Sequence, residues 1–145
     1  MESQENVAVF QRFVDEVING GNVSYIDEVV SPDFVEHEEL PPGMPDGREA
    51  PKALFSLLHV AFPDLHAEID DTLAQDDRVL LRMTWTGTQT GDFMGIPPTG
   101  RRVEFDVYDI VRVVGGKITE HWGLINQMKL MQQLGMVPEA GAAPA

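Results

Sequence analysis

The stretch RRVEFDVYDIVRVVGGKITEHWGLIN, residues 101–126, has the pattern of two β-strands joined by a two-residue turn. Apolar and polar residues alternate on both sides of Gly115 and Gly116, which is typical of strands with one buried face. Two consecutive glycines readily take the positive φ angles of a tight hairpin turn. The stretch therefore predicts an antiparallel hairpin with strands at residues 102–114 and 117–126.

The register of this hairpin predicts which side chains point into the protein. If the two glycines form the turn, Val114 lies opposite Lys117 and Asp109 lies opposite Trp122. The more apolar face is expected under the rest of the fold, and it carries Phe105, Val107, Asp109, Val111, Val113, Ile118, Glu120, Trp122, Leu124 and Asn126. His121 is then expected on the outer face.

The rest of the chain predicts helices before the hairpin and further strands beside it. Apolar residues at helical spacing indicate helices, and alternation indicates strands. The expected helices lie at residues 7–18, 23–30, 51–61 and 128–134, and the further strands at 33–39, 65–75 and 78–89. Helices followed by an antiparallel sheet give an α+β fold. We expect one domain at residues 1–137 and a flexible tail at 138–145.

The charge of the chain excludes several classes of partner. Ten Lys and Arg residues stand against 24 Asp and Glu residues, for a net charge of −14. Such a surface repels the phosphates of nucleic acids and anionic lipids, so neither nucleic acid nor membrane is an expected partner. The N-terminus has no basic start followed by an apolar core, and no apolar run is long enough to span a membrane. We expect a cytoplasmic protein.

Asp109 is the first candidate for a chemical role, because a carboxylate on an apolar inner face needs a partner or a function. Arg82, in the strand RVLLRMTWTGT, is the expected ion-pair partner, and a structural and a catalytic role for the aspartate both remain open. His37, in FVEHEE, is expected to line the pocket or its rim. Glu38 and Glu39 are interpreted as a solvated edge.

Neither a metal nor a cofactor is predicted. Adjacent residues of a strand point to opposite faces, so the run HEE at residues 37–39 does not form a ligand set by itself. The chain has no cysteine, and no glycine-rich loop leads into a helix.

Three segments together resemble the SnoaL-like polyketide cyclase, or ester cyclase, family. They are DFVEHEELPPGMPDGREAPKALF, FPDLHAEIDDTLAQDDRVLLRMTWTGTQTGDFMGIPPTGRRVEFDVYDIVRV and GGKITEHWGLINQMKLMQQLG, within a region from about Val7 to Gly135. The resemblance implies the cone-shaped α+β barrel of nuclear-transport-factor-2-like proteins. In that fold a strongly bent antiparallel sheet wraps a pocket, and the N-terminal helices close it.

The resemblance also implies an activity. Cyclases of this family close a ring by intramolecular aldol condensation without metal or cofactor, with a pocket carboxylate as acid and base. The family's usual aspartate follows the Trp of EHW by four residues, and Asn126 stands at that position here. Because an amide does not exchange protons near neutral pH, we expect Asp109 to act as the base, with His37 as a second proton-transfer group. Arg82 or Asn126 would stabilise the enolate.

The sequence thus predicts a cofactor-free enzyme that acts on a small hydrophobic carbonyl compound. The expected substrate-binding residues are Trp122, Trp85, Phe105 and Leu124. A non-catalytic binding domain for an apolar metabolite and an epoxide hydrolase that uses Asp109 with Arg82 are the alternatives. Tyr108, Ile110 and Ile125 make the expected outer face too apolar for full solvation, so we predict a homodimer.

Overall fold

A computed structural model of the chain describes residues 2–137. The predicted tail at 138–145 lies outside the described residues. The elements, in order, are α1 (Glu2–Phe13), the π-helical turn η1 (Val14–Asn19), the 3₁₀ turn η2 (Val23–Tyr25), α2 (Ile26–Val29), β1 (Val30–Glu36), α3 (Glu49–Ala61), β2 (His66–Gln75), β3 (Arg78–Thr88), β4 (Arg102–Val114), β5 (Lys117–Ile125) and α4 (Gln127–Gln133). No helix among residues 2–137 has the length and apolar character needed to cross a bilayer.

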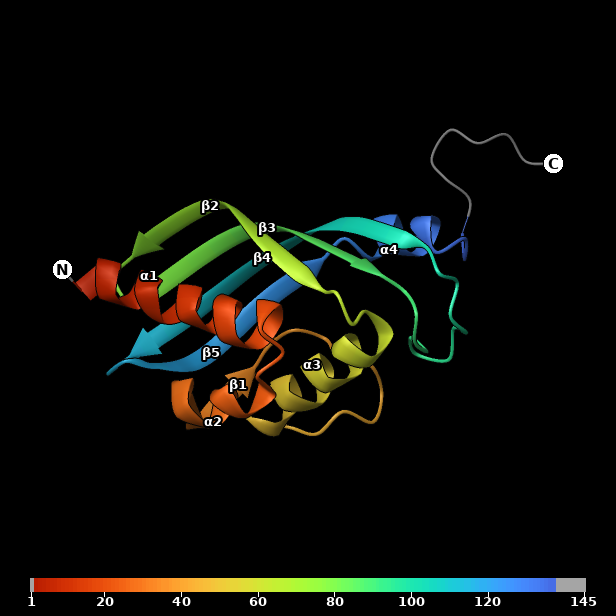
Figure 1. Cartoon of the computed structure of the whole chain (residues 1–145). Helices are drawn as coiled ribbons and strands as arrows, with labels where there is room; N and C mark the ends of the chain where they lie inside the picture. The colour runs from red at the N-terminus through yellow and green to blue at the C-terminus, as the bar shows by residue number, and fades with distance from the viewer. Residues whose placement is uncertain (1, 138–145) are drawn as a thin grey trace.

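One curled sheet contains all five strands, in the order β1-β5-β4-β3-β2 (Figure 1). The strands β2 to β5 form the predicted antiparallel meander, and the turn glycines Gly115 and Gly116 have positive φ angles. The edge strand β1 pairs with β5 in parallel, so the sheet is mixed and not wholly antiparallel. This strand begins at Val30, three residues earlier than predicted, because Pro32 favours extended backbone and is tolerated at a sheet edge.

The register of the β4–β5 hairpin differs from the prediction after its second pair. Val114 lies opposite Lys117 and Val113 opposite Ile118, as expected, but Arg112 lies opposite Glu120. Thr119 is therefore an extra residue on β5, a β-bulge, and every later position of that strand changes face. The predicted inward position of Trp122 and outward position of His121 are both wrong for this reason.

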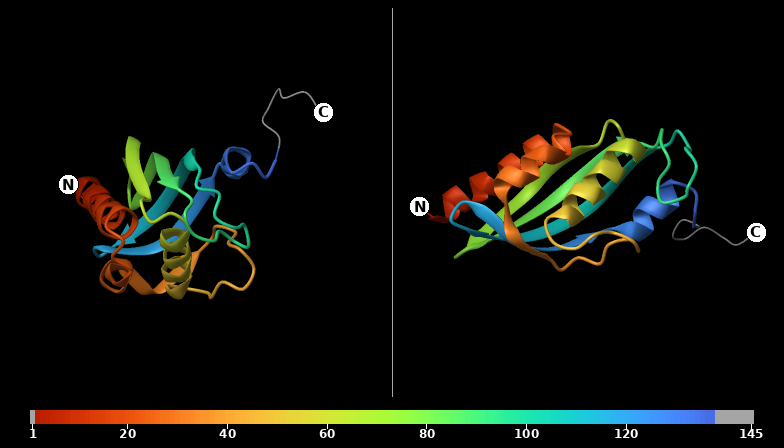
Figure 2. Two further views of the ribbon diagram at one scale, coloured as in Figure 1. Left: turned by 45° about the vertical axis from the view of Figure 1, so that its right-hand side comes forward. Right: turned by 90° about the horizontal axis from the view of Figure 1, so that it is seen from below.

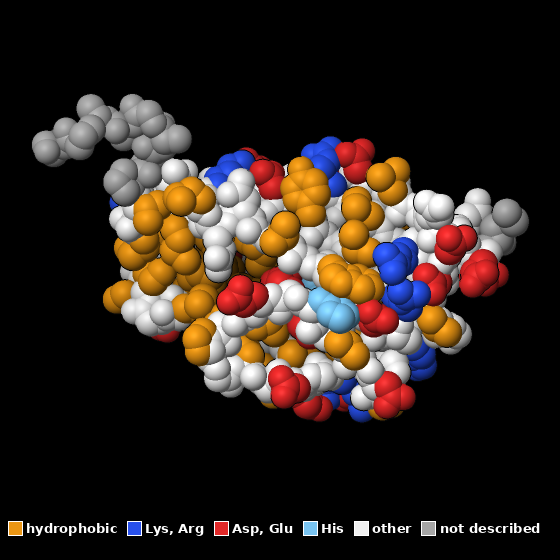
Figure 3. All heavy atoms as spheres, turned by 180° about the vertical axis from the view of Figure 1, so that it is seen from behind, with side chains coloured by type: hydrophobic (Ala, Val, Ile, Leu, Met, Phe, Trp, Pro, Cys, Tyr) orange, Lys and Arg blue, Asp and Glu red, His pale blue; other side chains and the backbone are white. Residues whose placement is uncertain are grey.

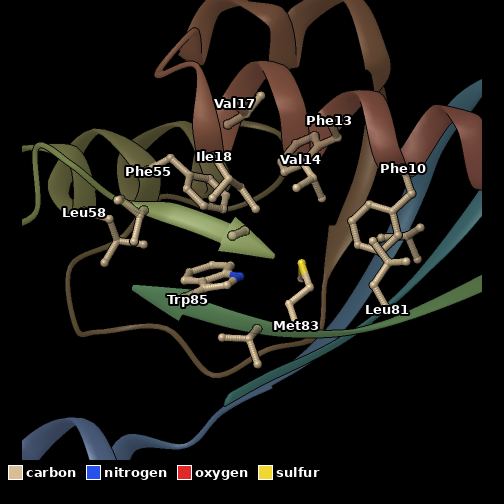
Figure 4. Close-up of a cluster of buried hydrophobic side chains, with 14 of the residues drawn as sticks. Phe10, Phe13, Val14, Val17, Ile18, Phe55, Leu58, Leu81, Met83 and Trp85 are labelled. Atoms are coloured by element: carbon tan, nitrogen blue, oxygen red, sulfur yellow. The ribbon is translucent and has the colours of Figure 1, made fainter. Parts of the chain in front are cut away.

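The core lies on the concave side of the sheet, where α1, η1 and α3 cover it (Figure 2). Aromatic side chains from both layers meet there: Phe13 contacts Phe55, and Phe55 contacts Trp85, with ring centroids 5.7 and 6.0 Å apart (Figure 4). Their burial contributes to the hydrophobic stabilisation that holds the helices on the sheet. The predicted α+β architecture, a bent sheet closed by N-terminal helices, is confirmed.

Candidate active site

An apolar cavity lies between the helices α1 and α3 and the concave face of the sheet. Its lining includes phenylalanines from the helices and from β1, Trp85 from β3, and aliphatic residues of β4 and β5. The cavity has a volume of only about 40 Å³. A ligand larger than a few atoms therefore requires the lining side chains to move apart.

One wall of the cavity carries four titratable groups, which are Glu36, Glu38, Asp109 and His121. The imidazole of His121 bridges two of them: Nδ1 lies 2.5 Å from Glu36 Oε1, and Nε2 lies 2.8 Å from Asp109 Oδ1. Because an ionised carboxylate only accepts hydrogen bonds, both ring nitrogens carry hydrogen and the ring is an imidazolium. His121 is therefore the cationic centre of this wall.

The electrostatics of His121 agree with this geometry. Burial by itself would lower the pKa of the imidazole, since it disfavours the charged form. The negative charge of Asp109 and the hydrogen bonds that the imidazolium donates to both carboxylates outweigh that effect and raise the pKa of His121 well above its usual value of 6.5. Asp109 is only 7% exposed, so its charge acts on the imidazolium with little screening.

The surroundings of Glu38 raise the pKa of its carboxyl group. Burial raises its pKa first, the negative charge of Asp109 raises it further, and the cationic His121 partly opposes both, with a resulting pKa of about 7. Ligand atoms of Glu38, Asp109 and His121 lie within 4.8 Å of one another. A carboxyl group with such a pKa can both remove and return a proton at neutral pH.

The backbone at Gly123 lets these groups converge. Gly123 lies opposite Asp109 in the β4–β5 ladder. A Cβ atom at this position would collide with Asp109 Oδ1, Glu38 Oε1 and the His121 ring. Only glycine leaves this space to the three side chains, so the site requires a glycine at position 123.

Two of the acidic groups reach the wall through β1, and the sequence contained a signal for them. Side chains at every second position of a strand share a face, so Phe34, Glu36 and Glu38 point the same way. The His37 N–H donates to the carbonyl oxygen of His121 at 2.9 Å, which extends the pairing of β1 with β5 past Glu36. The interpretation of Glu38 as a solvated edge is wrong. Phe34 lies four positions earlier on the same face and is buried, which indicated that Glu38 points into the protein.

Two predicted site residues, Trp122 and His37, lie on the outer face of the sheet. Their rings stack with centroids 4.7 Å apart and an interplanar angle of 7°, and the Arg78 guanidinium lies 5.2 Å from the indole centroid. His37 Nε2 also lies 3.0 Å from Glu120 Oε2. The prediction that Trp122 and His37 contribute to the pocket is wrong, because the bulge turns position 122 outward and residue 37 alternates with the inward Glu36 and Glu38.

Arg82 is also on the outer face. Its guanidinium pairs with Asp71, with Nη2 2.6 Å from Oδ2, and lies 3.9 Å from Asp70. The predicted ion pair between Arg82 and Asp109 is wrong, since consecutive positions of β3 alternate and Leu81, opposite Asp109, takes the inward one. The epoxide-hydrolase alternative loses the carboxylate and guanidinium pair on which it depended.

Leu124 and Asn126 also lie away from the cavity. Leu124 is 75% exposed, because it alternates with the inward Gly123. Asn126 follows the end of β5 and caps α4, where its Oδ1 accepts a hydrogen bond from the Lys129 N–H at 3.2 Å. The substitution of the family's usual aspartate at this position therefore leaves the four-residue cluster intact.

Trp85 and Phe105 point inward, as predicted. Trp85 lines the cavity and is 2% exposed. Phe105 lies opposite Trp85 in the β3–β4 ladder and packs edge-on against the indole, with centroids 6.0 Å apart. Phe105 is buried behind this contact and is not among the residues that line the cavity.

The residue types of the wall would also suit a divalent cation. Glu38, Asp109 and His121 each offer one ligand atom, and these atoms are close enough to surround one ion. Both nitrogens of His121 already bond to carboxylates, however, so a metal would have to displace Glu36 or Asp109 from the ring. The hydrogen-bonded imidazolium is the arrangement that the structure describes.

Comparison with known proteins identifies the family. The model of the SnoaL-like polyketide cyclases matches residues 8–134. The chain belongs to the SnoaL-like polyketide cyclase family. It is 26% identical to the nogalonic acid methyl ester cyclase of Streptomyces nogalater, over 81% of this chain and 88% of that protein. It is 28% identical to the aklanonic acid methyl ester cyclase DauD of Streptomyces sp. (strain C5), over 84% of this chain and 79% of that protein.

Solved structures agree with this assignment. The fold of this SnoaL-like cyclase matches AclR of Streptomyces galilaeus, for which a hydroxylase activity has been suggested, with a TM-score of 0.83 and 35% identity. The match covers 95% of this chain and 85% of AclR. The predicted family, fold and enzyme class are confirmed, and the cyclases among the relatives support cyclase chemistry over a non-catalytic binding domain.

Proposed function

We propose that this SnoaL-like protein catalyses an intramolecular aldol condensation in which Glu38 transfers the proton. The observation that carries the proposal is the placement of Glu38 beside the imidazolium of His121, on the one charged wall of an otherwise apolar cavity. Removal of a proton from the carbon beside a carbonyl group is favoured by a base in a site with little water and by a positive charge where the enolate forms. The wall supplies both.

The reaction can be written with every proton accounted for. Ionised Glu38 removes a proton from the carbon beside a carbonyl group, and the electron pair of the C–H bond enters the enolate. The enolate carbon then forms a bond to a second carbonyl carbon of the same molecule, whose oxygen becomes an alkoxide. The alkoxide takes the proton from Glu38, which restores the base.

His121 stabilises the negative charge of the enolate, while Glu36 and Asp109 are positioning residues that hold the imidazolium. Fixed charges aimed at a developing oxyanion stabilise it strongly in a site that excludes water. Because the two carboxylates bond to both ring nitrogens, the ring cannot rotate or lose its proton easily. This assignment replaces Asp109 as the predicted base.

The substrate we propose is a small hydrophobic carbonyl compound of the polyketide ester type, by analogy with the relatives named for nogalonic and aklanonic acid methyl esters. Apolar lining favours such a molecule over a charged metabolite. Glu38 also borders two open grooves outside the cavity, one beside residues 40–47 and one beside Leu124 and Met94. We place the entrance of the cavity at Glu38.

The test of this function is deuterium exchange into the acetyl group of 2-acetylnaphthalene in D₂O, followed by proton NMR. The wild-type protein is expected to accelerate exchange, and Glu38→Gln is expected to lower the rate by about 100-fold or more, the scale of a lost general base. Glu104→Gln, which changes an exposed carboxylate of the outer face, is the matched control and should leave the rate unchanged.

Two results would contradict the proposal. Exchange in Glu38→Gln at the wild-type rate would exclude Glu38 as the base. Tight binding of the ketone by the wild-type protein with no exchange would favour a binding domain instead.

A further inference from the structure

The cavity contains a second polar group, far from the charged wall, that the aldol proposal does not use. Three buried side-chain nitrogens among residues 2–137 make no hydrogen bond of good geometry: Asn6 Nδ2, Trp85 Nε1 and Arg112 Nε, of which the last lies 3.3 Å from Glu120 Oε1 in an ion pair. Trp85 is the one of the three that lines the cavity. A buried N–H without an acceptor is costly, and sites that bind a ligand oxygen often hold such a donor in readiness.

The position of Trp85 along β3 gives its distance from the charged wall of the cavity. Asp109 lies opposite Leu81, and Trp85 follows Leu81 by four residues on the same face of β3. At about 3.3 Å per residue, the two levels are about 13 Å apart along the strand. The indole nitrogen points toward the Met83 side, which is the side of the charged wall (Figure 4).

The surroundings of Trp85 hold the indole in place. Its ring packs between Phe55 of α3 and Phe105 of β4, with both centroids 6.0 Å away. An indole fixed on two sides cannot turn its N–H toward another acceptor at low cost. The donor is therefore preorganised, and its partner has to come from a molecule in the cavity.

We propose that the Trp85 N–H donates a hydrogen bond to an oxygen of the substrate at the end remote from Glu38. The site then takes an elongated, largely apolar compound with an enolisable carbonyl at one end and a second oxygen acceptor roughly 10 Å away, given the strand rise. This inference rests on the proposed function for the identity of the reacting end. Trp85 is a specificity-determining residue that distinguishes substrates by their remote oxygen.

The experiment compares two probes of the same shape. In 2,6-diacetylnaphthalene the remote group is a carbonyl, and in 2-acetyl-6-isopropenylnaphthalene a CH₂ group replaces that oxygen. By calorimetry, the wild-type protein is expected to bind the diketone about tenfold more tightly, the effect of one neutral hydrogen bond. Trp85→Phe is expected to bind both probes equally. Phe10→Leu, the control, changes another aromatic residue of the cavity lining that carries no N–H, and it should weaken both probes to the same extent.

A second measurement uses the wild-type protein alone and does not depend on the stability of Trp85→Phe. The chain has two tryptophans, so ¹⁵N-labelled protein gives two indole N–H signals, which Trp122→Phe assigns. The diketone should move the Trp85 indole proton downfield, and the isopropenyl probe should not. An unmoved Trp85 signal at saturation, equal affinity for the probes in the wild type, no binding of the diketone, or a preference that survives in Trp85→Phe would overturn the inference.

The outcome separates this inference from the aldol proposal. A protein that distinguishes the two probes but exchanges no deuterium into their acetyl groups would contradict the proposed reaction and leave the role of Trp85 supported. Glu38-dependent exchange without any preference between the probes would support the proposed reaction and contradict the role of Trp85.

Discussion

At the scale of single residues, the site depends on a charge arrangement that costs folding free energy. Glu38 lies in a cavity wall with Asp109, and burial and that charge raise its pKa to about 7. The hydrogen bonds of His121 to Glu36 and Asp109 offset part of the cost, because they neutralise charge inside the wall. Active sites commonly keep such unfavourable groups where catalysis needs them.

The pH dependence of the reaction should report the ionisation of Glu38. As a base, Glu38 must be ionised, so kcat/KM for deuterium exchange is expected to rise with pH and to level off above its pKa of about 7. The rate is to be measured from pH 5 to pH 9 in the wild type and in Glu38→Gln. A rising limb that persists in Glu38→Gln would assign the limb to another group.

The ionisation of Glu38, which raises the reaction rate, should lower the free energy of unfolding. Its folded pKa of about 7 lies above the ordinary value of 4.5, so the native state holds the proton more tightly and loses stability as the pH rises from 4.5 to 7. Glu38→Gln removes this loss. The variant is expected to be more stable than the wild type at pH 8, on the order of 2 kcal/mol or 5 °C in Tm, and equally stable at pH 4.

Thermal unfolding by circular dichroism at both pH values measures this difference. Glu104→Gln serves again as the control and should show the same Tm difference from the wild type at pH 4 and pH 8. If the Tm difference between Glu38→Gln and the wild type were the same at pH 4 and pH 8, the carboxyl group would ionise without cost in the folded protein.

At the scale of the elements, one extra residue in β5 decides which side chains form the site. The bulge at Thr119 moves His121 to the concave face and Trp122 to the outer face. Thr119 Oγ1 bonds back to the Arg112 carbonyl oxygen at 3.3 Å, which closes the bulge against β4. A bulge also increases the local twist of a strand, in agreement with the curl of this sheet.

Deletion of Thr119 is expected to be tolerated. Because Thr119 has no partner in β4, its removal joins two regular stretches, and Glu120 stays opposite Arg112. We expect a change in Tm within about 5 °C and retained deuterium exchange. Deletion of Thr84, which is regularly paired with Glu68 and Asp106, reverses the faces of half a strand and should unfold the protein. An equal loss of stability from the two deletions would contradict the assignment of the register shift to Thr119.

At the scale of the whole molecule, the outer face of the sheet is too apolar for a solvated surface. Side chains paired across four strands form a row, which runs through Leu73, Leu80, Ile110 and Trp122. Beside this row, Tyr108 lies opposite Leu124, and both are exposed. Figure 3, which views the molecule from behind, shows apolar side chains among acidic and basic ones on this face. We propose that this face joins two copies of the chain.

Sedimentation equilibrium at micromolar concentration tests the dimer. The expected mass is twice the 16.1 kDa of one chain. Ile110→Lys, at the centre of the row, should give the mass of one chain with an unchanged circular dichroism spectrum, because a desolvated ammonium opposes association. Val60→Lys, an exposed position on α3, is the control and should remain a dimer. A wild-type protein with the mass of one chain would contradict the proposal.

The sequence by itself determined the elements of this protein. Alternation predicted β2, β3, β4 and β5 to within one residue of their ends, and the glycine pair predicted the hairpin turn. The inward direction of Asp109 and Phe105 followed from the same alternation, because the period of a strand is a local property of the backbone. The resemblance to the SnoaL-like family further supplied the closed, bent sheet.

Only the tertiary structure decided which charged groups meet. Glu36 contacts His121 across 85 positions of the chain, through the parallel pairing of β1 with β5. No local pattern marks that pairing, and a bulge at Thr119 leaves no sign in a run of alternating residues. Each of these features depends on contacts between distant strands, and a shift of one residue is enough to exchange the two faces. The charged wall around Glu38 is therefore a product of strand pairing, which the order of residues along one strand does not contain.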